Sequence, residues 1–497
     1  MGLNLASIVT ESAGRSPGAV AVRLGDVELT YADLDERSAR LATLLRERGI
    51  GAGDRVGVML PNVPEFPIAY YSVLRAGGIV VPMNVLLKRR EIAFYLEDSG
   101  AKLLLAWHGF GDEAGGGAAD AGAELIEVEP AAFAELLGGN EPGPGLAATD
   151  EEDTAVILYT SGTTGKPKGA ELTHFNLHRN ADVAGRTTCE IEPGDIVLGS
   201  LPLFHSFGQT VSMNASLKVG ATLTLLPKFD PADALETMQR DRVTHFYGVP
   251  TMYGALLHHP GRVAFDTSSL RTCITGGASM PVEVLRGFEE AFDCIVLEGY
   301  GLSETSPVSS SNHPARERKP GSIGTPLEDV ELRLVDEHDD PVPPGEIGEI
   351  VIRGHNIMKG YWQRPDATAE AMRGGWFHSG DLARIDEDGY FFIVDRKKDM
   401  IIRGGYNVYP REVEEVLYEH PRIREAAVVG LPDDEWGEEI GAAVVLHDGE
   451  ELSPREVSDY VKERIAAYKY PRVVWFLEEL PKGPTGKILK REIEVPA

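Results

Sequence analysis

One segment of the chain combines glycines, hydroxyl side chains and lysines in a pattern suited to holding phosphate. It reads Tyr159-Thr160-Ser161-Gly162-Thr163-Thr164-Gly165-Lys166-Pro167-Lys168-Gly169-Ala170. Glycine lets backbone N–H groups turn toward an anion, while the hydroxyls add donors and the lysines add positive charge. The segment is not a Walker A loop, because a proline rather than a glycine stands five positions after Gly162. We expect a phosphate-binding loop; a flexible surface turn is the alternative.

Other side chains have chemistry that suits a nucleotide. Tyr300 offers an aromatic face for a purine, and Glu304 offers the hard oxygen that Mg²⁺ prefers beside substrate phosphates. Asp381 follows a glycine at an expected turn and can accept hydrogen bonds from both hydroxyls of a ribose. Arg396 would support the ribose or a phosphate. Taken singly, each residue has an ordinary alternative: a core tyrosine, a solvated glutamate, a turn-capping aspartate and a surface arginine.

Lys487 stands close to the end of the chain, in the run Pro481-Lys482-Gly483-Pro484-Thr485-Gly486-Lys487. Proline and glycine favour a loop here, and no acidic residue occurs from 481 to 491. When a carboxylate attacks a phosphate, two anions converge, and a cation between them stabilises the transition state. Lys487 is a candidate for that cation, and a solvated lysine is the alternative.

The strands and helices that would position these residues are indicated by short apolar runs, often followed by helical patterns. Such runs are typical of strands buried on both faces, so they predict a layered α/β architecture. They lie at 56–60, 103–105, 155–158, 196–198, 222–226 and 294–297. The glycine- and alanine-rich stretch 114–122 is expected to be a surface loop.

The hydrophobic pattern of the sequence changes after about residue 320. The runs 331–335 and 349–353 alternate, as half-buried strands do, and predict a smaller β-rich lobe. Residues 399–497 are expected to hold a strand, a helix from Pro410 to about Leu417, two more strands and another helix. We therefore predict a large N-terminal domain over 1–394, a hinge over 395–398 and a small mobile α+β domain over 399–497.

Bulk composition narrows the class of protein. Over 497 residues, 42% are hydrophobic and 25% charged, as in soluble globular proteins. The formal net charge of −30 disfavours nucleic acid and anionic lipid as partners, and anionic ligands would need local basic islands. The most apolar stretch, 68–87, is expected to form a helix, a turn and a strand rather than a membrane span. Cys189, Cys273 and Cys294 lack CxxC spacing and are expected to be free thiols in a reducing cytoplasm, and the first residues are not expected to form a signal peptide.

The phosphate-binding segment resembles the signature loop of the adenylate-forming superfamily, which includes acyl-CoA synthetases, luciferases and the adenylation domains of nonribosomal peptide synthetases. The resemblance is specific because further motifs of that family follow in order across almost the whole chain. They are Gly276-Gly277-Ala278, Glu298-Gly299-Tyr300-Gly301-Leu302-Ser303-Glu304-Thr305, His378-Ser379-Gly380-Asp381, Asp395-Arg396-Lys397-Lys398-Asp399, Gly404-Gly405-Tyr406-Asn407 and Pro484-Thr485-Gly486-Lys487.

The resemblance implies roles for particular residues. Lys487 and Glu304 would be catalytic, with Glu304 a ligand of Mg²⁺, and His205 would help to position the acyl carboxylate. Phe207, Tyr247, Gly248 and Val249 are candidates for an acyl tunnel, although an ordinary core explains them equally well. The residues implied to bind ATP are Thr160, Ser161, Gly162, Thr163, Thr164, Gly165, Lys168, Gly277, Ala278, Gly299, Tyr300, Gly301, Ser303, Asp381, Arg396, Gly404 and Gly405.

The implied activity is that of an ATP-dependent acyl-CoA synthetase, which forms acyl-AMP and pyrophosphate and then transfers the acyl group to coenzyme A. The motif at 299–305 and the region 84–104 are most similar to fatty-acyl-CoA synthetases. This implies a medium- or long-chain fatty acid as substrate and a place in cytoplasmic fatty acid metabolism. An aryl-CoA ligase, or an acyl-AMP ligase that loads a carrier protein, is the alternative, and a homo-oligomer is left open. We expect no integral membrane association.

Two function classes outside the family compete. A phosphate-releasing NTPase or kinase is disfavoured by the missing Walker A loop, and it would release phosphate rather than pyrophosphate. A non-catalytic binding protein on the same fold is disfavoured by the presence of Lys487, Glu304 and Asp381. Exchange between ATP and pyrophosphate would separate a ligase from both.

Overall fold

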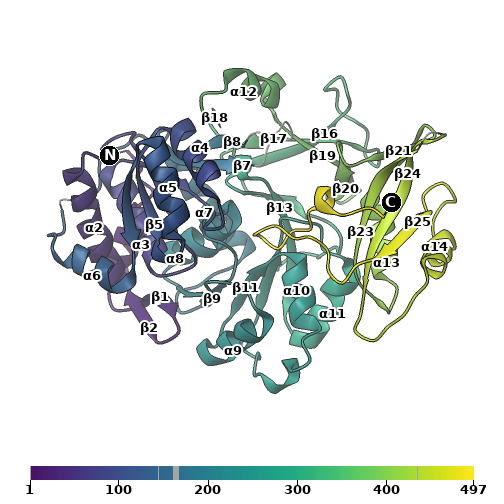
Figure 1. Ribbon diagram of the computed structural model, residues 1–497, viewed down its shortest axis with the longest axis horizontal. Coiled ribbons are helices and arrows are strands. Elements are labelled where there is room, and N and C mark those ends of the chain that lie inside the picture. The colour runs from purple at the N-terminus through teal and green to yellow at the C-terminus, as the bar shows by residue number, and fades with distance from the viewer. Residues whose placement is uncertain (1, 144, 161–166, 434, 497) are drawn as a thin grey trace.

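The protein is represented by a computed structural model that describes residues 2–143, 145–160, 167–433 and 435–496. Figure 1 shows one large body beside a smaller body formed by the C-terminal residues from 399 onward. We call this smaller body the lid. The described residues form four β-sheets of nine, seven, five and four strands. The two largest sheets give the layered α/β architecture that the apolar runs predict.

The seven-stranded sheet has the order β18-β8-β7-β4-β3-β5-β6. Its strands pair in parallel from β7 to β6, as strands joined by helices do, while β8 pairs antiparallel with both β7 and β18. The elements of this layer are β3 (Arg55–Met59), α3 (Glu65–Ala76), β4 (Ile79–Pro82), α4 (Arg89–Ser99), β5 (Ala101–Trp107), α5 (Gly111–Ala121), β6 (Glu124–Val128), β7 (Thr154–Thr160), β8 (Lys168–Thr173) and β18 (Gly360–Tyr361).

The nine-stranded sheet has the order β15-β14-β13-β12-β11-β9-β10-β1-β2. It is parallel from β13 to β1 and antiparallel at both edges. Its strands are β1 (Val20–Leu24), β2 (Val27–Thr30), β9 (Ile196–Gly199), β10 (Thr222–Leu225), β11 (His245–Gly248), β12 (Thr272–Thr275), β13 (Ile295–Gly301), β14 (Val308–Ser311) and β15 (Thr325–Pro326). The helices around the two sheets include α1 (Ser7–Arg15), α2 (Tyr31–Glu47), α6 (Pro130–Gly138), α7 (His174–Val183), α8 (Ala215–Val219), α9 (Pro231–Asp241), α10 (Pro250–Leu257) and α11 (Val282–Phe292).

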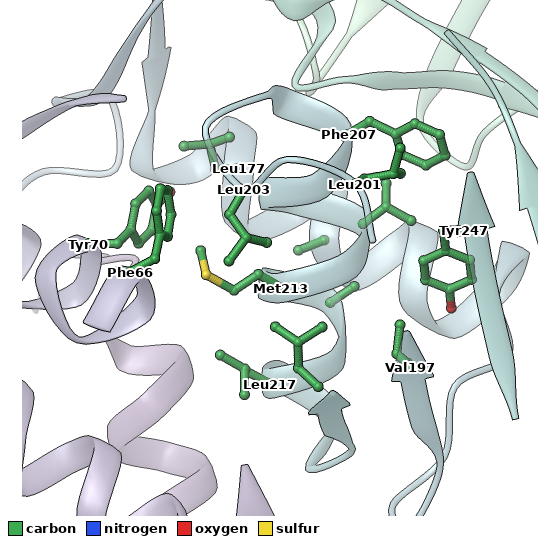
Figure 2. Packing of buried hydrophobic residues seen from close by; sticks show 14 of the residues in the cluster. Phe66, Tyr70, Leu177, Val197, Leu201, Leu203, Phe207, Met213, Leu217 and Tyr247 are labelled. Carbon is green, nitrogen blue, oxygen red and sulfur yellow. The ribbon is translucent and has the colours of Figure 1, made fainter. Parts of the chain in front are cut away.

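The main hydrophobic core joins these two sheets. Figure 2 shows Leu203, Met213 and Leu217 between the aromatic side chains of α3 and Tyr247 of β11, and all belong to one buried cluster. Alternation along a strand sends neighbouring side chains to opposite faces, so Val58 of β3 enters this core while Met59 enters a separate outer cluster. The sheets are therefore covered on both faces, which explains why the predicted runs are apolar throughout.

The four-stranded sheet is an antiparallel meander of β16 (Val330–Val335), β17 (Gly348–Gly354), β19 (Phe377–Ile385) and β20 (Phe391–Arg396). The β-rich lobe was expected to have half-buried strands, and for β17 this is wrong. Ile350 and Ile352 enter the main core, while Val351 packs on the other face with Val335 and Trp376. An apolar cluster on each face buries the strand completely at these positions.

The lid has a five-stranded sheet of β22 (Tyr406–Val408), β21 (Ile401–Arg403), β24 (Gly437–Leu446), β23 (Ile423–Asp433) and β25 (Val473–Phe476). Helices α13 (Pro410–Tyr418) and α14 (Pro454–Lys462) pack on it around a hydrophobic core of the lid's own. The predicted helix from Pro410 is thus confirmed within one residue at its end. The division into domains at 394 and 398 stays a prediction.

The stretch 114–122 was expected to be a loop, and that prediction is wrong because α5 spans most of it. Its small residues permit close packing against α4, since a Cβ added at Gly117 would lie 2.5 Å from the Ile92 side chain. Ala114 and Ala118 are buried in the outer cluster. Glycine and alanine here indicate close contact between helices rather than a flexible turn.

The stretch 68–87 forms α3, a turn and β4, as predicted. Within the described residues, no helix is both long and apolar enough to span a lipid bilayer. The thiols of Cys189, Cys273 and Cys294 are free, as expected.

Candidate active site

A cavity of about 960 Å³ lies where the ends of β12 and β13, the four-stranded sheet and a loop of the lid meet. In Figure 1 the yellow C-terminal segment leaves the lid and reaches toward β13 and α10. The cavity is lined by most of the predicted site residues that the structure describes: Thr160, Lys168, His205, Gly277, Gly299, Tyr300, Gly301, Ser303, Glu304, Asp381, Arg396 and Lys487. Residues 276–277, 299–304, 378–381, 396–398, 483–485 and 487 are thus brought together from distant parts of the chain.

Several predicted residues do not line this cavity. Ala278 lies outside its lining. Gly404 and Gly405 form the tight turn of the β21–β22 hairpin, with φ of +57° and +83°, on the lid and away from the cavity. Ser161, Gly162, Thr163, Thr164 and Gly165 lie outside the described residues.

Asp381 is the centre of the part of the cavity suited to a nucleoside. Asp381 lies in β19 directly opposite Arg396 of β20, and not at the turn that its preceding glycine predicts. The hydroxyl of Tyr300 donates to Asp381 Oδ2 at 2.6 Å, and Arg396 Nε lies 3.2 Å from Oδ1. Burial, together with this carboxylate, raises the pKa of Tyr300 well above its usual value, so the phenol stays a hydrogen-bond donor. Tyr300 and Arg396 thus fix the Asp381 carboxylate, which is able to accept hydrogen bonds from a diol.

Glycine is required beside this carboxylate. A Cβ at Gly301 would lie 1.7 Å from the carbonyl oxygen of Pro307, so only glycine lets the end of β13 pass its neighbour. Gly277 follows β12 with φ of +77° and also lines the cavity. These positions leave backbone, rather than side chains, on the wall next to Tyr300.

Glu304 also lines the cavity, beside the ends of β7 and β18. Its Oε1 accepts hydrogen bonds from the hydroxyls of Tyr361 at 2.9 Å and Thr160 at 3.4 Å. Lys168, at the start of β8, has its ammonium 5.1 Å from the centre of the Tyr361 ring. Tyr361 was missed by the sequence analysis, because only the pairing of β18 with β8 brings it here. The carboxylate is therefore held in place close to Thr160, at the end of β7.

Lys487 enters the cavity on a short turn of the lid. Gly486 N donates to Gly483 O and Gly483 N to Lys487 O, both at 2.8 Å, which closes the turn. Thr251 of α10 fixes the turn to the large body, since its hydroxyl donates to Gly486 O at 2.8 Å. Burial and the nearby Arg396 lower the pKa of Lys487 to about 8. The lysine is thus a half-buried cation that an anionic ligand would stabilise.

His205 also lines the cavity, in electrostatic contact with Lys487. Burial first, and then the Lys487 charge, lower the pKa of His205 to about 4, so the ring is neutral at physiological pH. The backbone N–H of Phe207 donates to its Nδ1 at 3.3 Å, which assigns the ring proton to Nε2. His205 can therefore donate one hydrogen bond into the cavity without carrying charge.

The rest of the cavity wall is mostly apolar. Phe207 and Val249 line it, as the tunnel hypothesis expects, whereas Tyr247 and Gly248 do not. Tyr247 is fully buried behind the wall, because β11 lies in the middle of the nine-stranded sheet and turns this side chain into the core. Uncharged side chains that sequence analysis did not identify complete this end: Ala184, Thr188, Cys189, Leu201, Val211, Ile274 and Val308.

Comparison with known proteins gives a consistent result. The sequence model of a family described as AMP-binding enzyme matches residues 9–362, and that of the AMP-binding enzyme C-terminal domain matches 412–487. A long-chain-fatty-acid–CoA ligase of Bacillus subtilis is 39% identical over 98% of this chain and 94% of its own. A feruloyl-CoA synthase of Amycolatopsis is 42% identical over 98% of both chains. The solved structure of the anthranilate CoA ligase AuaEII with anthranoyl-AMP has a TM-score of 0.94 at 29% identity, covering 99% of this chain and 96% of that one.

Proposed function

Because the chain belongs to the AMP-binding enzyme family and is an ATP-dependent, AMP-forming acid–thiol ligase, we propose that it joins a medium- or long-chain fatty acid to coenzyme A. One observation carries the choice of acid. The cavity that contains Asp381, Glu304 and Lys487 continues without interruption into the apolar end at Cys189, Val211 and Ile274. An acid bound there has its carboxylate near Lys487 and His205 and its hydrocarbon body out of water.

The nucleotide is proposed to lie between the two halves of the polar region. Asp381, held by Tyr300 and Arg396, suits the ribose hydroxyls, and the wall at Gly277 and Gly301 leaves space for a purine. Glu304 fits a Mg²⁺ ligand because it is a fixed, nearly buried carboxylate beside Thr160, and Mg²⁺ prefers carboxylate combined with substrate phosphates. A bound Mg²⁺ would neutralise phosphate charge. Among the residues that the structure describes, no group of three or more His, Cys, Asp and Glu side chains could hold a metal by itself.

The proposed first step forms a bond between a carboxylate oxygen and the α-phosphorus of ATP and breaks the bond to pyrophosphate. Lys487 stabilises the negative charge that accumulates as these anions meet, and His205 can hold the carboxylate through its Nε2 proton. In the second step the thiol of coenzyme A loses its proton and attacks the acyl carbon, and AMP leaves. The basic residues Arg396, Lys397 and Lys398 line the same cavity and would attract the phosphates of coenzyme A.

An aryl acid is the second candidate substrate. It is favoured by the 42% identity with a protein named feruloyl-CoA synthase, and also by the solved ligases named for anthranilate and benzoate. The fully buried Tyr247 behind the wall near Cys189 would limit how far a long chain could extend.

A panel of acids tests the choice of substrate. Each methylene buried in the apolar end is worth about 0.8 kcal/mol, or roughly fourfold in kcat/KM, until the space is filled. We expect CoA-dependent AMP release to rise from butanoate to longer saturated acids and to exceed that with benzoate and ferulate by about tenfold or more. A higher value for the aryl acids would select the second candidate. AMP formation that depends on a carrier protein, and not on coenzyme A, would contradict the proposal that coenzyme A is the acyl acceptor.

The pH dependence of adenylation tests the role of Lys487. Its pKa of about 8 means that the ammonium is present below pH 8 and is lost as the pH rises through that value. We expect kcat/KM for ATP–pyrophosphate exchange to fall about tenfold per pH unit above pH 8, while His205 stays neutral throughout. Lys487→Arg should be slower but should lack this alkaline decline, since arginine stays protonated. An unchanged decline in that variant would assign it to another group.

A further inference from the structure

A second contact between the lid and the large body lies outside the cavity, at the start of α13. Arg411 and Glu415, one helical turn apart, face Gly321 and the first residue of α11, Val282. Neither belongs to the residues that line the cavity. The side chain of Arg411 is only 12% exposed, so its charge needs partners.

Arg411 finds those partners mainly on the other side of the junction. Its Nη1 donates to Ile393 O at 2.8 Å and its Nη2 to Gly321 O at 3.2 Å. Its backbone N–H donates to Asp395 Oδ2 at 3.2 Å. Within the helix, its Nε lies 3.7 Å from Glu415 Oε1. Both side-chain hydrogen bonds thus run from the lid to strand and loop carbonyls of the large body.

Carboxylates surround the arginine. Glu415 Oε2 accepts a hydrogen bond from Val282 N at 3.4 Å, at the N-terminus of an eleven-residue helix where negative charge is stabilised. Glu298, fully enclosed in the large body, accepts from Met280 N at 3.1 Å. Burial raises the pKa of Glu298 to about 7, and the charge of Arg411 opposes that rise. Removing Arg411 would leave the buried Glu298 and the half-buried Glu415 without this neighbouring cation.

We propose that Arg411 and Glu415 act as a positioning pair that holds the lid where Lys487 reaches the cavity. Any rotation of the lid that withdraws the Lys487 turn must also break the contacts to Ile393, Gly321 and Val282. By contrast, the ion pair between Lys490 and Glu414 lies within the lid and would survive. The pair therefore sets how much of the protein is ready for adenylation and how much for transfer to the thiol. This inference rests on the proposed two-step function.

The test compares Arg411→Ala, Arg411→Lys and a matched control, Arg422→Ala. Arg422 is another half-buried lid arginine whose guanidinium binds a backbone carbonyl, that of Glu451, inside the lid. ATP–pyrophosphate exchange reports adenylation, and acyl-CoA formation from supplied acyl-AMP reports transfer. We expect Arg411→Ala to lower exchange by about 10- to 100-fold without slowing transfer, since a lost charge-assisted bond shifts a two-state population by that order. Arg411→Lys should restore part of the exchange, and Arg422→Ala should change neither reaction.

A distance measurement separates this inference from the function on which it rests. Dyes on Val263→Cys in the large body and Ile402→Cys in the lid, both exposed positions, report lid position in a Cys294→Ser background. We expect energy transfer to change with Arg411→Ala and not with Arg422→Ala. Equal loss of both half-reactions with unchanged energy transfer would overturn the positioning role. Failure of the unsubstituted protein to make acyl-CoA would instead overturn the proposed function, and the dye pair would still test the contact.

Discussion

Replacing Lys487 by alanine is expected to slow acyl-adenylate formation by about 10²- to 10³-fold, as loss of one preorganised electrostatic contact typically does. The lysine is a half-buried cation whose turn is fixed against α10 by Thr251. Asp381 and Arg396, which we propose to bind the ribose, remain in place, so the KM for ATP should change far less than kcat. Transfer from supplied acyl-AMP to coenzyme A does not bring a carboxylate against the phosphates of ATP, so it should stay within about threefold of the unsubstituted rate.

The control for Lys487→Ala is Lys482→Ala, because Lys482 lies at the base of the same loop. Its ammonium pairs with Glu425 of the lid at 2.7 Å, and it is not part of the cavity wall. Stopped-flow measurement of acyl-AMP formation and a separate measurement of thioester formation would give the two rates. If Lys482→Ala slowed adenylation as much as Lys487→Ala, loop structure rather than the Lys487 charge would be responsible. If Lys487→Ala slowed both half-reactions alike, the lysine would not be specific to the first.

Much of the fold could be predicted because buried strands impose a simple requirement on sequence. The apolar runs that became β3, β5, β7, β9, β10 and β13 are buried on both faces, so nearly every residue must be apolar. The wrong predictions for β17 and α5 came from neighbours in space that the local sequence does not reveal. The sequence of β17 predicted one solvent-exposed face, but Trp376 covers that face. The glycines of α5 allow close packing against α4.

The candidate site was predictable only where residues occur in ordered motifs. Tyr361 and Thr251 support Glu304 and the Lys487 turn, yet each meets its partner across 57 and 235 residues of sequence, respectively. Nothing in their surroundings along the chain signals this, since tyrosine and threonine are common in cores and caps. Similarly, Tyr247 was a candidate for the acyl tunnel, but it lies on β11 in the middle of the sheet and does not line the cavity. Residue type predicts chemistry, but strand order decides which side chains share a cavity.

Backbone hydrogen bonds indicate which residue at the junction between the large body and the lid could act as the pivot. Asp395 and Arg396 are paired in the sheet with β19, and Lys397 N donates to Gly380 O at 3.0 Å. Among the described residues, none accepts a hydrogen bond from the backbone N–H of Lys398, whereas Asp399 and Met400 both donate to Arg396 O. Within the predicted hinge over 395–398, we therefore propose Lys398 as the point about which the lid turns.

Replacing Lys398 by proline is expected to leave adenylation within about threefold of normal and to reduce transfer to coenzyme A by about 100-fold or more. Proline fixes φ near −65° and restricts the preceding residue, so it limits rotation at the proposed pivot without removing a hydrogen bond seen here. The thiol must reach the acyl carbon that the Lys487 turn now faces, and a lid that cannot turn keeps that position occupied. Lys398→Ala is the matched control, because it removes the same side chain and keeps the backbone free. Both half-reactions should be assayed in each variant. Equal loss of transfer in Lys398→Ala would assign the effect to the ammonium. Normal transfer in Lys398→Pro would show that the lid does not turn at this residue.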